Sequence, residues 1–138
     1  MRYLVDANVL SEPTRPTPAT SVLDWLQTNE RHLVIDPIVL GEIRFGIHLL
    51  PSGRRKERLE RWFHSGIARI LCLDWNAQTG LRWAELLAKL RSSETAMPIK
   101  ESLIAASALQ HGLTVATRDV ADFTKAGVRV VNPFEGDT

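Results

Sequence analysis

Short apolar runs alternate along this chain with longer stretches of helical periodicity, and this alternation limits the folds that the chain can adopt. Five runs have the length and aliphatic content of buried strands: 2–5, 32–36, 68–74, 113–117 and 128–132. Helical spacing occupies the sequence between them, at 19–30, 38–50, 54–65, 77–93, 99–111 and, as a short turn, 119–127. Strands separated by helices pair in parallel. We therefore predict an α/β fold whose central parallel sheet of about four to five strands is flanked by helices, in a single domain over residues 1–138.

The composition favours a globular protein over a disordered or membrane-spanning one. Of 138 residues, 44% are hydrophobic and 24% charged, and the formal net charge is +1. No apolar run reaches the roughly 18 residues that a bilayer span requires, and the N-terminus lacks the apolar core of a signal peptide. We expect a cytoplasmic protein without membrane attachment. The single cysteine, Cys72, has no partner for an intramolecular disulfide, and its apolar neighbours predict a buried position.

Acidic residues directly follow four of the predicted strands or turns. They are Asp6, Asp36, Asp74 and Asp119. Parallel α/β sheets bind ligands beyond the carboxyl ends of their strands, so each of these side chains could reach one crevice.

Two further acids lie inside predicted helices. Glu42 shares an apolar stripe with Val39, Ile43 and Phe45, in a helix expected to pack on the sheet. A carboxylate there needs a metal, an arginine or hydrogen-bond donors. Glu101 lies in the first turn of its helix, where it either serves a site or complements the helix dipole.

Carboxylates gathered in one crevice repel one another, and such clusters are typically built around a hard divalent cation such as Mg²⁺. Metal-assisted phosphodiester cleavage is therefore the leading interpretation. The candidate acids are Asp6, Glu42, Glu101 and Asp119.

Four segments together resemble the acidic motifs of the PIN domain, and most closely those of VapC-type and FitB-type ribonuclease toxins of bacterial toxin–antitoxin pairs. The segments are LVDANVLSE, VLGEIRFGI, PIKESLIAASAL and TVATRDVADF. The resemblance covers almost the whole chain, from about Tyr3 to Phe134. It implies a metal-dependent endoribonuclease that uses Mg²⁺ or Mn²⁺, forms a homodimer and is neutralised by a small antitoxin.

The resemblance also implies roles for single residues. Asp6, Glu42 and Asp119 match the family's metal-binding acids, whereas position 101 carries Glu where Asp is usual. Because Mg²⁺ demands tight geometry, we expect Glu101 to face the cleft and to make a weaker or indirect metal contact. Supporting positions are Asn8, Thr117 and Asp122. Candidate phosphate contacts are Arg15, Lys100 and Arg118.

The basic segment at 53–62 has two interpretations. It forms either a solvated helix face with mixed-sign pairs or a rim that meets the phosphates of RNA.

Two other functions stay open. A PIN-fold binding protein with weakened or lost nuclease activity is compatible with Glu101. A receiver-type or phosphatase-like α/β domain also clusters acids at strand ends, but no lysine follows a strand as a receiver domain requires. The four histidines, His32, His48, His64 and His111, lack ligand spacing, which argues against general acid–base cleavage by a histidine pair.

Overall fold

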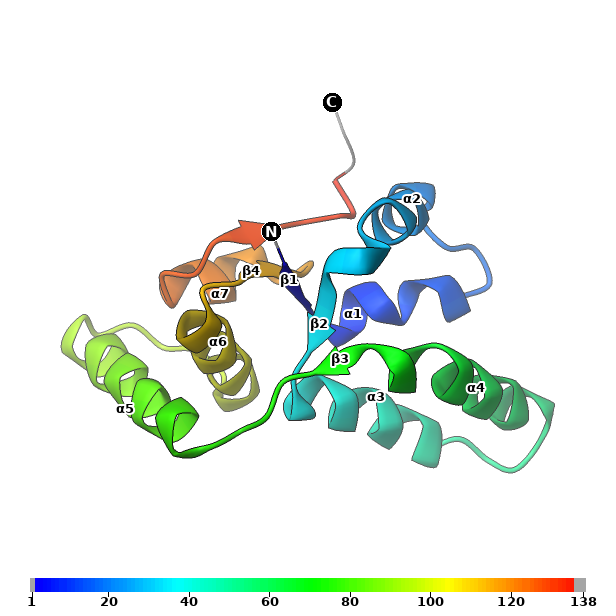
Figure 1. Cartoon of the computed structure of the whole chain (residues 1–138), viewed down its shortest axis with the longest axis horizontal. Coiled ribbons are helices and arrows are strands. Elements are labelled where there is room, and N and C mark those ends of the chain that lie inside the picture. The colour runs from blue at the N-terminus through cyan, green and yellow to red at the C-terminus, as the bar shows by residue number, and fades with distance from the viewer. Residues whose placement is uncertain (1, 136–138) are drawn as a thin grey trace.

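The computed structural model describes residues 2–135, in which five strands form one parallel sheet with the order β3-β2-β1-β4-β5 (Figure 1). The strands are β1 (Tyr3–Val5), β2 (Leu33–Ile35), β3 (Leu71–Cys72), β4 (Thr114–Ala116) and β5 (Val130–Val131). The predicted fold class is confirmed, and each predicted strand occurs in the structure. The strands are shorter than their apolar runs, because the flanking residues turn into helices or loops.

Seven α-helices surround the sheet in the described part of the chain. They are α1 (Ala7–Leu10), α2 (Thr20–Thr28), α3 (Pro37–His48), α4 (Arg54–Ser65), α5 (Ala77–Ser92), α6 (Ile99–His111) and α7 (Val120–Lys125). Their ends follow local chemistry. Asp36 caps α3 ahead of Pro37. Asn76 and Thr79 form a capping box at the start of α5. Gly112 ends α6 in the left-handed conformation, with φ of 65°.

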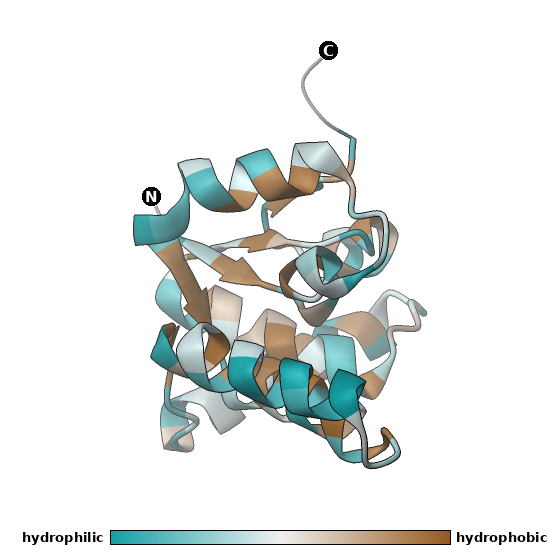
Figure 2. Cartoon of the chain, turned by 90° about the vertical axis from the view of Figure 1, so that its right-hand side faces the viewer, coloured by the Kyte–Doolittle hydropathy of each residue, from teal (hydrophilic) through white to brown (hydrophobic). Residues whose placement is uncertain are grey.

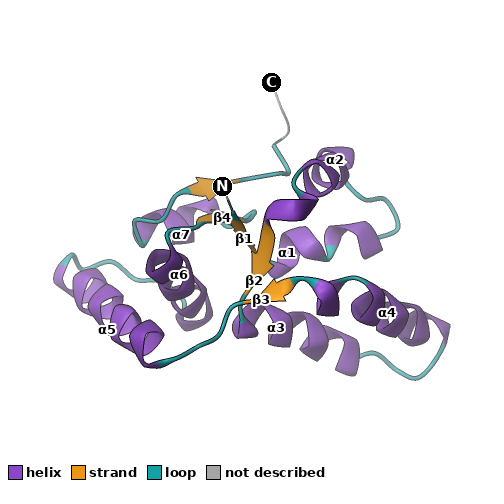
Figure 3. Cartoon of the chain, viewed as in Figure 1, coloured by secondary structure: helices purple, strands orange, loops and turns teal. Residues whose placement is uncertain are grey.

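The helices lie on two sides of the strands. Figure 1 and Figure 3 show α5, α6 and α7 to the left of the sheet and α1 to α4 to the right. Between them, strand residues such as Leu4, Ile35 and Val115 are fully buried. The strands are brown in the hydropathy view, and the helices around them carry hydrophilic residues on their outer turns (Figure 2). Burial of this apolar surface is the main force that holds the layers together.

The order of the strands reverses between β1 and β4. From β1 the chain builds outward to β2 and β3, and then crosses back through α5 and α6 to place β4 on the other side of β1. Leu4 of β1 therefore lies in register with both Val34 and Val115. In open parallel sheets such a reversal opens a crevice at the carboxyl ends of the two strands. Asp6 directly follows β1 and Thr117 directly follows β4 at this point.

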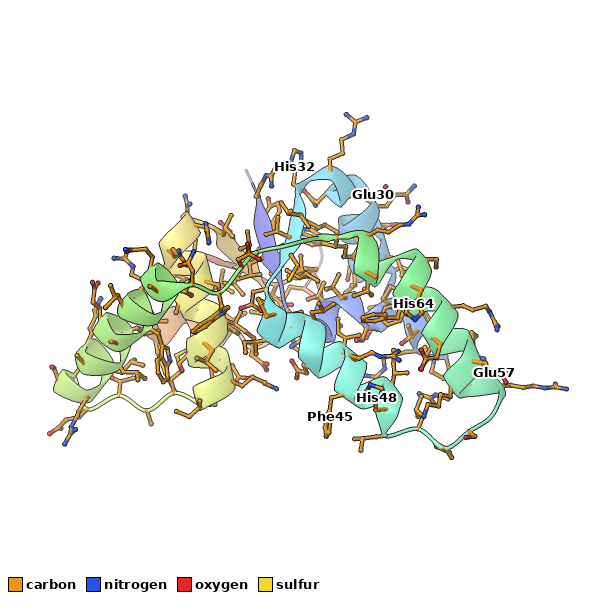
Figure 4. All side chains as sticks on the ribbon, turned by 60° about the horizontal axis from the view of Figure 1, so that its bottom comes forward. Glu30, His32, Phe45, His48, Glu57 and His64 are labelled. Atoms are coloured by element: carbon orange, nitrogen blue, oxygen red, sulfur yellow. The ribbon has the colours of Figure 1, made fainter. Side chains whose placement is uncertain are left out.

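Two local features differ from the sequence predictions. The segment after Asp6 forms the short helix α1, which sequence analysis did not anticipate. Phe45, expected on the buried stripe of α3, is 62% exposed and points away from the body of the protein (Figure 4). It lies two positions from Ile43 and Ile47, which are buried, and a displacement of about 200° turns a helical side chain to the opposite face.

None of the helices within residues 2–135 is long and apolar enough to cross a membrane.

Candidate functional site

Asp6 and Thr117 meet at the ends of the two central strands. The hydroxyl of Thr117 donates a 2.8 Å hydrogen bond to Oδ2 of Asp6. The other oxygen of Asp6, Oδ1, accepts a 2.8 Å hydrogen bond from the backbone N–H of Ala7. Thr117 Oγ1 also accepts from the backbone N–H of Asp119, at 2.9 Å. Both oxygens of Asp6 are thus held in place, and the loop after β4 carries Asp119 to the same crevice.

Asn8 bridges two of the predicted acids. Its amide nitrogen lies 3.4 Å from Asp6 Oδ2 and 3.3 Å from Asp119 Oδ2. Its Oδ1 accepts a 3.2 Å hydrogen bond from the backbone N–H of Arg118, which fixes the orientation of the amide. The short helix α1 places Asn8 there, one turn after β1 ends.

Glu42 and Glu101 form a second pair of acids, contributed by α3 and α6. Lys100 Nζ lies 2.5 Å from Glu42 Oε1 and 3.8 Å from Glu101 Oε1. The Glu101 side chain is only 12% exposed, so it is directed into the protein. Lys100 was predicted to contact a phosphate, and in this structure its ammonium binds carboxylates instead.

Electrostatic coupling joins the two pairs. The pKa of Asp6 is raised from 3.8 to about 6, chiefly because the side chain is buried. The charges of Glu42 and Asp119 raise it further, against the lowering effect of the hydrogen bonds from Thr117 and Ala7. A strongly perturbed carboxyl group beside other acids, at the carboxyl ends of parallel strands, is typical of functional sites.

The chemistry of these donors fits a hard divalent cation. All four acids offer carboxylate oxygens, the ligands that Mg²⁺ and Mn²⁺ prefer. One of them, Glu42 Oε2, is buried without a hydrogen-bond partner within residues 2–135. A buried carboxylate oxygen without a partner is costly, and a cation would satisfy it. As the side chains stand, no group of three or more His, Cys, Asp or Glu in the described part of the chain could hold a metal ion. A nitrogen-bearing side chain lies between the two acids of each pair: Asn8 between Asp6 and Asp119, and Lys100 between Glu42 and Glu101.

Other acids that follow strands serve different purposes. Asp36 is fully buried, and its oxygens accept hydrogen bonds from the Val39 backbone N–H at 2.9 Å and from Ser107 Oγ at 3.0 Å. Asp74 is exposed. Asp122 forms an exposed ion pair with Lys125 at 3.5 Å. None of the three has a hydrogen bond or ion pair to the four candidate acids in the described residues.

Two of the predicted phosphate contacts have neighbours of their own. The Arg118 guanidinium stacks on the ring of Phe134, 3.6 Å from its centroid. Arg15 lies 3.9 Å from Glu12.

A basic cavity of about 490 Å³ lies between the segment after α1 and helix α4. It is lined by Pro13, Thr14, Arg15, Pro16, Arg55, Arg58, Leu59 and Trp62. No acidic residue lines it, and Arg55 and Arg58 form no ion pair within residues 2–135. By contrast, Glu60 of the same helix pairs with Arg44 of α3 at 2.6 Å. On α4, Glu60 is thus ion-paired, whereas the guanidinium groups of Arg55 and Arg58 have no carboxylate partner in the described residues.

Sequence analysis missed one buried acid, Glu12. Its Oε2 accepts a 2.8 Å hydrogen bond from the Ala19 backbone N–H and so closes the proline-rich loop that carries Arg15. The only signal in the sequence was an acid at the start of a loop rich in proline, where backbone N–H groups need acceptors.

Comparison with known proteins finds a matching family model and several relatives. The PIN domain family model matches residues 3–128. The plasmid stability protein StbB of Pseudomonas syringae pv. tomato is 41% identical in an alignment that covers 96% of this chain and 98% of that protein. The VapC ribonuclease Y4jK of Sinorhizobium fredii is 34% identical, with 96% and 97% covered. The toxin FitB of Neisseria gonorrhoeae is 33% identical, with 95% and 97% covered.

Structural similarity extends over nearly the whole chain. The fold superposes on a chain in the structure of FitAB bound to an IR36 DNA fragment with a TM-score of 0.91. The two chains are 31% identical, and the match covers 99% of this chain and 98% of that one.

Proposed function

The chain belongs to the PIN-domain family, and we propose that it is a metal-dependent endoribonuclease toxin that a small antitoxin holds in check. The observation that carries this proposal is that Asn8 and Lys100 each bridge a pair of acids, and that the charge of one acid from each pair raises the pKa of Asp6. Four carboxylates form these two pairs. They are Asp6, Glu42, Glu101 and Asp119. The names of two relatives, VapC ribonuclease Y4jK and toxin FitB, support both the activity and the biological class.

In this proposal Asp6, Glu42 and Asp119 bind a Mg²⁺ or Mn²⁺ ion directly, and Glu101 makes a weaker or water-mediated contact. The unpartnered oxygen of Glu42 supports the first part, and the longer side chain of Glu101 supports the second. When bound, the ion would lower the pKa of a water molecule and stabilise the charge on the leaving oxygen.

Neighbouring residues of the chain hold the carboxylates of the site in place. Thr117 and the backbone of Ala7 hold the two oxygens of Asp6, so that this carboxylate keeps one orientation. Asn8 holds Asp119. Asp119 is exposed, so its carboxylate is the one that can accept a hydrogen bond from the attacking water.

RNA is the substrate that the basic cavity favours. The cavity lined by Arg15, Arg55 and Arg58 offers guanidinium groups to phosphates. Trp62 in the same cavity offers an aromatic face on which an unpaired base can stack. Phosphate contacts and stacking together are typical of proteins that bind single-stranded nucleic acid.

A protein partner is supported by charge and by exposed apolar surface. The four acids attract a cationic group, such as an arginine presented by an antitoxin. Phe45 on α3 and Leu49 directly after it are 62% and 68% exposed, which leaves apolar surface for an antitoxin or for a second copy of the chain in a homodimer. We place the active protein in the cytoplasm, where its RNA substrate occurs.

Cleavage of a fluorescent single-stranded RNA by the purified chain tests the proposal. We expect cleavage with Mg²⁺ or Mn²⁺, none with EDTA, and loss of activity in Asp6→Asn. A folded chain that binds RNA and cleaves nothing under any metal condition would favour a PIN-fold binding protein without nuclease activity.

A further inference from the structure

Lys100 places a positive charge between two of the four acids. Its Nζ contacts Glu42 Oε1 at 2.5 Å and lies 3.8 Å from Glu101 Oε1. The charge of Asp6 also acts on this ammonium group. No other lysine or arginine in the described residues forms an ion pair with any of the four candidate acids. One cation belonging to the chain therefore lies between two of the acids to which the proposed function assigns a metal ion.

The ion pair satisfies Glu42 only in part. Its Oε1 binds Lys100, whereas Oε2 is buried and has no hydrogen-bond partner within residues 2–135. An ammonium group is a single positive charge that reaches only one oxygen of this carboxylate. A divalent ion between the acids would bring more charge to the same place.

Lys100 is also able to leave. Its side chain is 47% exposed, and a lysine has a flexible four-carbon stem whose ammonium is readily hydrated. The corresponding bridge in the other pair of acids is Asn8, which is neutral and does not repel a cation. An incoming metal ion is therefore repelled by Lys100, beside the acids of α3 and α6, and not by Asn8.

We propose that Lys100 is a tethered cation that holds Glu42 and Glu101 together in the metal-free protein, and that a divalent ion must displace it. This inference rests on the proposed function, because it assigns the metal to the same acids. An ammonium group and a divalent ion on the same carboxylates repel each other. Lys100 therefore lowers the metal affinity of the site and stabilises the protein without metal.

Calorimetric titration with Mn²⁺ at pH 7.5, in the absence of RNA, tests the proposal. We expect Lys100→Met to bind Mn²⁺ with a Kd at least about fivefold lower than that of the wild-type chain. Lys100→Arg keeps the positive charge, and its fork can reach both oxygens of a carboxylate, so its Kd should be equal to or higher than the wild-type value. The same Lys100→Met variant should melt at a lower temperature than the wild type in EDTA, because Glu42 and Glu101 then repel each other without a cation between them.

Lys125→Met is the matched control, since Lys125 pairs with Asp122 outside the pocket. Its Kd for Mn²⁺ should not change. A Kd for Lys100→Met that equals or exceeds the wild-type value would overturn the proposal, and so would an equal gain in affinity in Lys125→Met. Absence of Mn²⁺ binding by the wild-type chain would instead remove the metal centre of the proposed function, and this inference with it.

Discussion

Thr117 donates its hydroxyl hydrogen to Asp6 across a distance of 2.8 Å, and this bond ties the end of β4 to the end of β1. The two residues are 111 positions apart in the sequence. They meet because β1 and β4 pair in parallel at the point where the strand order reverses. The bond orients the most perturbed acid of the pocket, and it also connects this acid to Asp119, whose backbone N–H binds the same hydroxyl oxygen.

Replacement of Thr117 by valine should remove this bond and keep the shape of the side chain. We expect kcat/KM for RNA cleavage to fall roughly ten- to a hundredfold, as is typical when the group that orients a metal ligand is lost. The free energy of unfolding should fall by about 1–2 kcal/mol. Thr124→Val is the control, because in the described residues that hydroxyl donates only to the carbonyl of Val120, at an exposed position on α7. A Thr117→Val variant with wild-type kcat/KM would show that Asp6 needs no orientation.

The pKa of Asp6 predicts how the stability of the metal-free protein depends on pH. The folded protein binds the proton with a pKa of about 6, and the ordinary value is 3.8. Between these values the folded state binds more protons than the unfolded state, so the free energy of unfolding falls as the pH rises from about 4 to about 6. Above pH 6 the loss in the free energy of unfolding, relative to its value at low pH, stays constant and is on the order of 3 kcal/mol.

Asp6→Asn removes this contribution, and we expect the variant to be more stable than the wild type at pH 7.5 in EDTA. Urea unfolding at pH 4.5 and 7.5 measures the difference. Burial raises the pKa of Asp36 as well, so only the difference between variant and wild type isolates Asp6. Equal stability of the two proteins at both values of pH would contradict the assigned pKa.

Metal binding should be linked to the same proton. Because ligands must be deprotonated to bind a metal, Mg²⁺ should raise the melting temperature at pH 7.5 and have much less effect at pH 5. Asp6→Asn should abolish the increase at both values. Differential scanning fluorimetry with and without EDTA is sufficient to measure it. An increase of the same size at pH 5 would indicate a metal site that does not involve Asp6.

The basic cavity predicts a salt-dependent contribution to RNA binding. Replacing Arg55 and Arg58 together by glutamine, in a chain inactivated by Asp6→Asn, should weaken the binding of single-stranded RNA. The slope of log K against log salt should become shallower by about 1.4, since each phosphate contact to single strands contributes about 0.7. Fluorescence anisotropy across a salt series measures both effects. The paired control, Arg31→Gln with Arg69→Gln, changes two exposed arginines outside the cavity and should leave the slope as it was.

Much of the fold followed from the sequence, because its signals are local. Alternating strands and helices, Pro37 after Asp36, and Gly112 at the end of α6 each specify a structure within a few residues. The acids were harder to separate. Asp36 follows a strand just as Asp6 does, but the hydroxyl of Ser107, 71 positions away, makes it a structural residue. Only the packing of α6 against the sheet decides this.

The position of Lys100 also depended on tertiary structure. Its sequence context was compatible with a phosphate contact, and nothing nearby in the sequence revealed that α3 would present Glu42 to it across 58 residues. Phe45 shows the same limit. An apolar pattern identified the helix correctly, but the face that is buried depends on the elements that pack against it.

The most direct test of the central claim compares two acids that lie three residues apart, Asp119 inside the pocket and Asp122 outside it. Mn²⁺-dependent cleavage of single-stranded RNA is measured for Asp119→Asn and Asp122→Asn, with folding checked by circular dichroism. We predict that Asp119→Asn loses at least about a hundredfold in kcat/KM, because a direct metal ligand is removed, and that Asp122→Asn stays within about threefold of the wild type. Equal losses in the two variants, or full activity in Asp119→Asn, would contradict the assignment of the four carboxylates as the nuclease site.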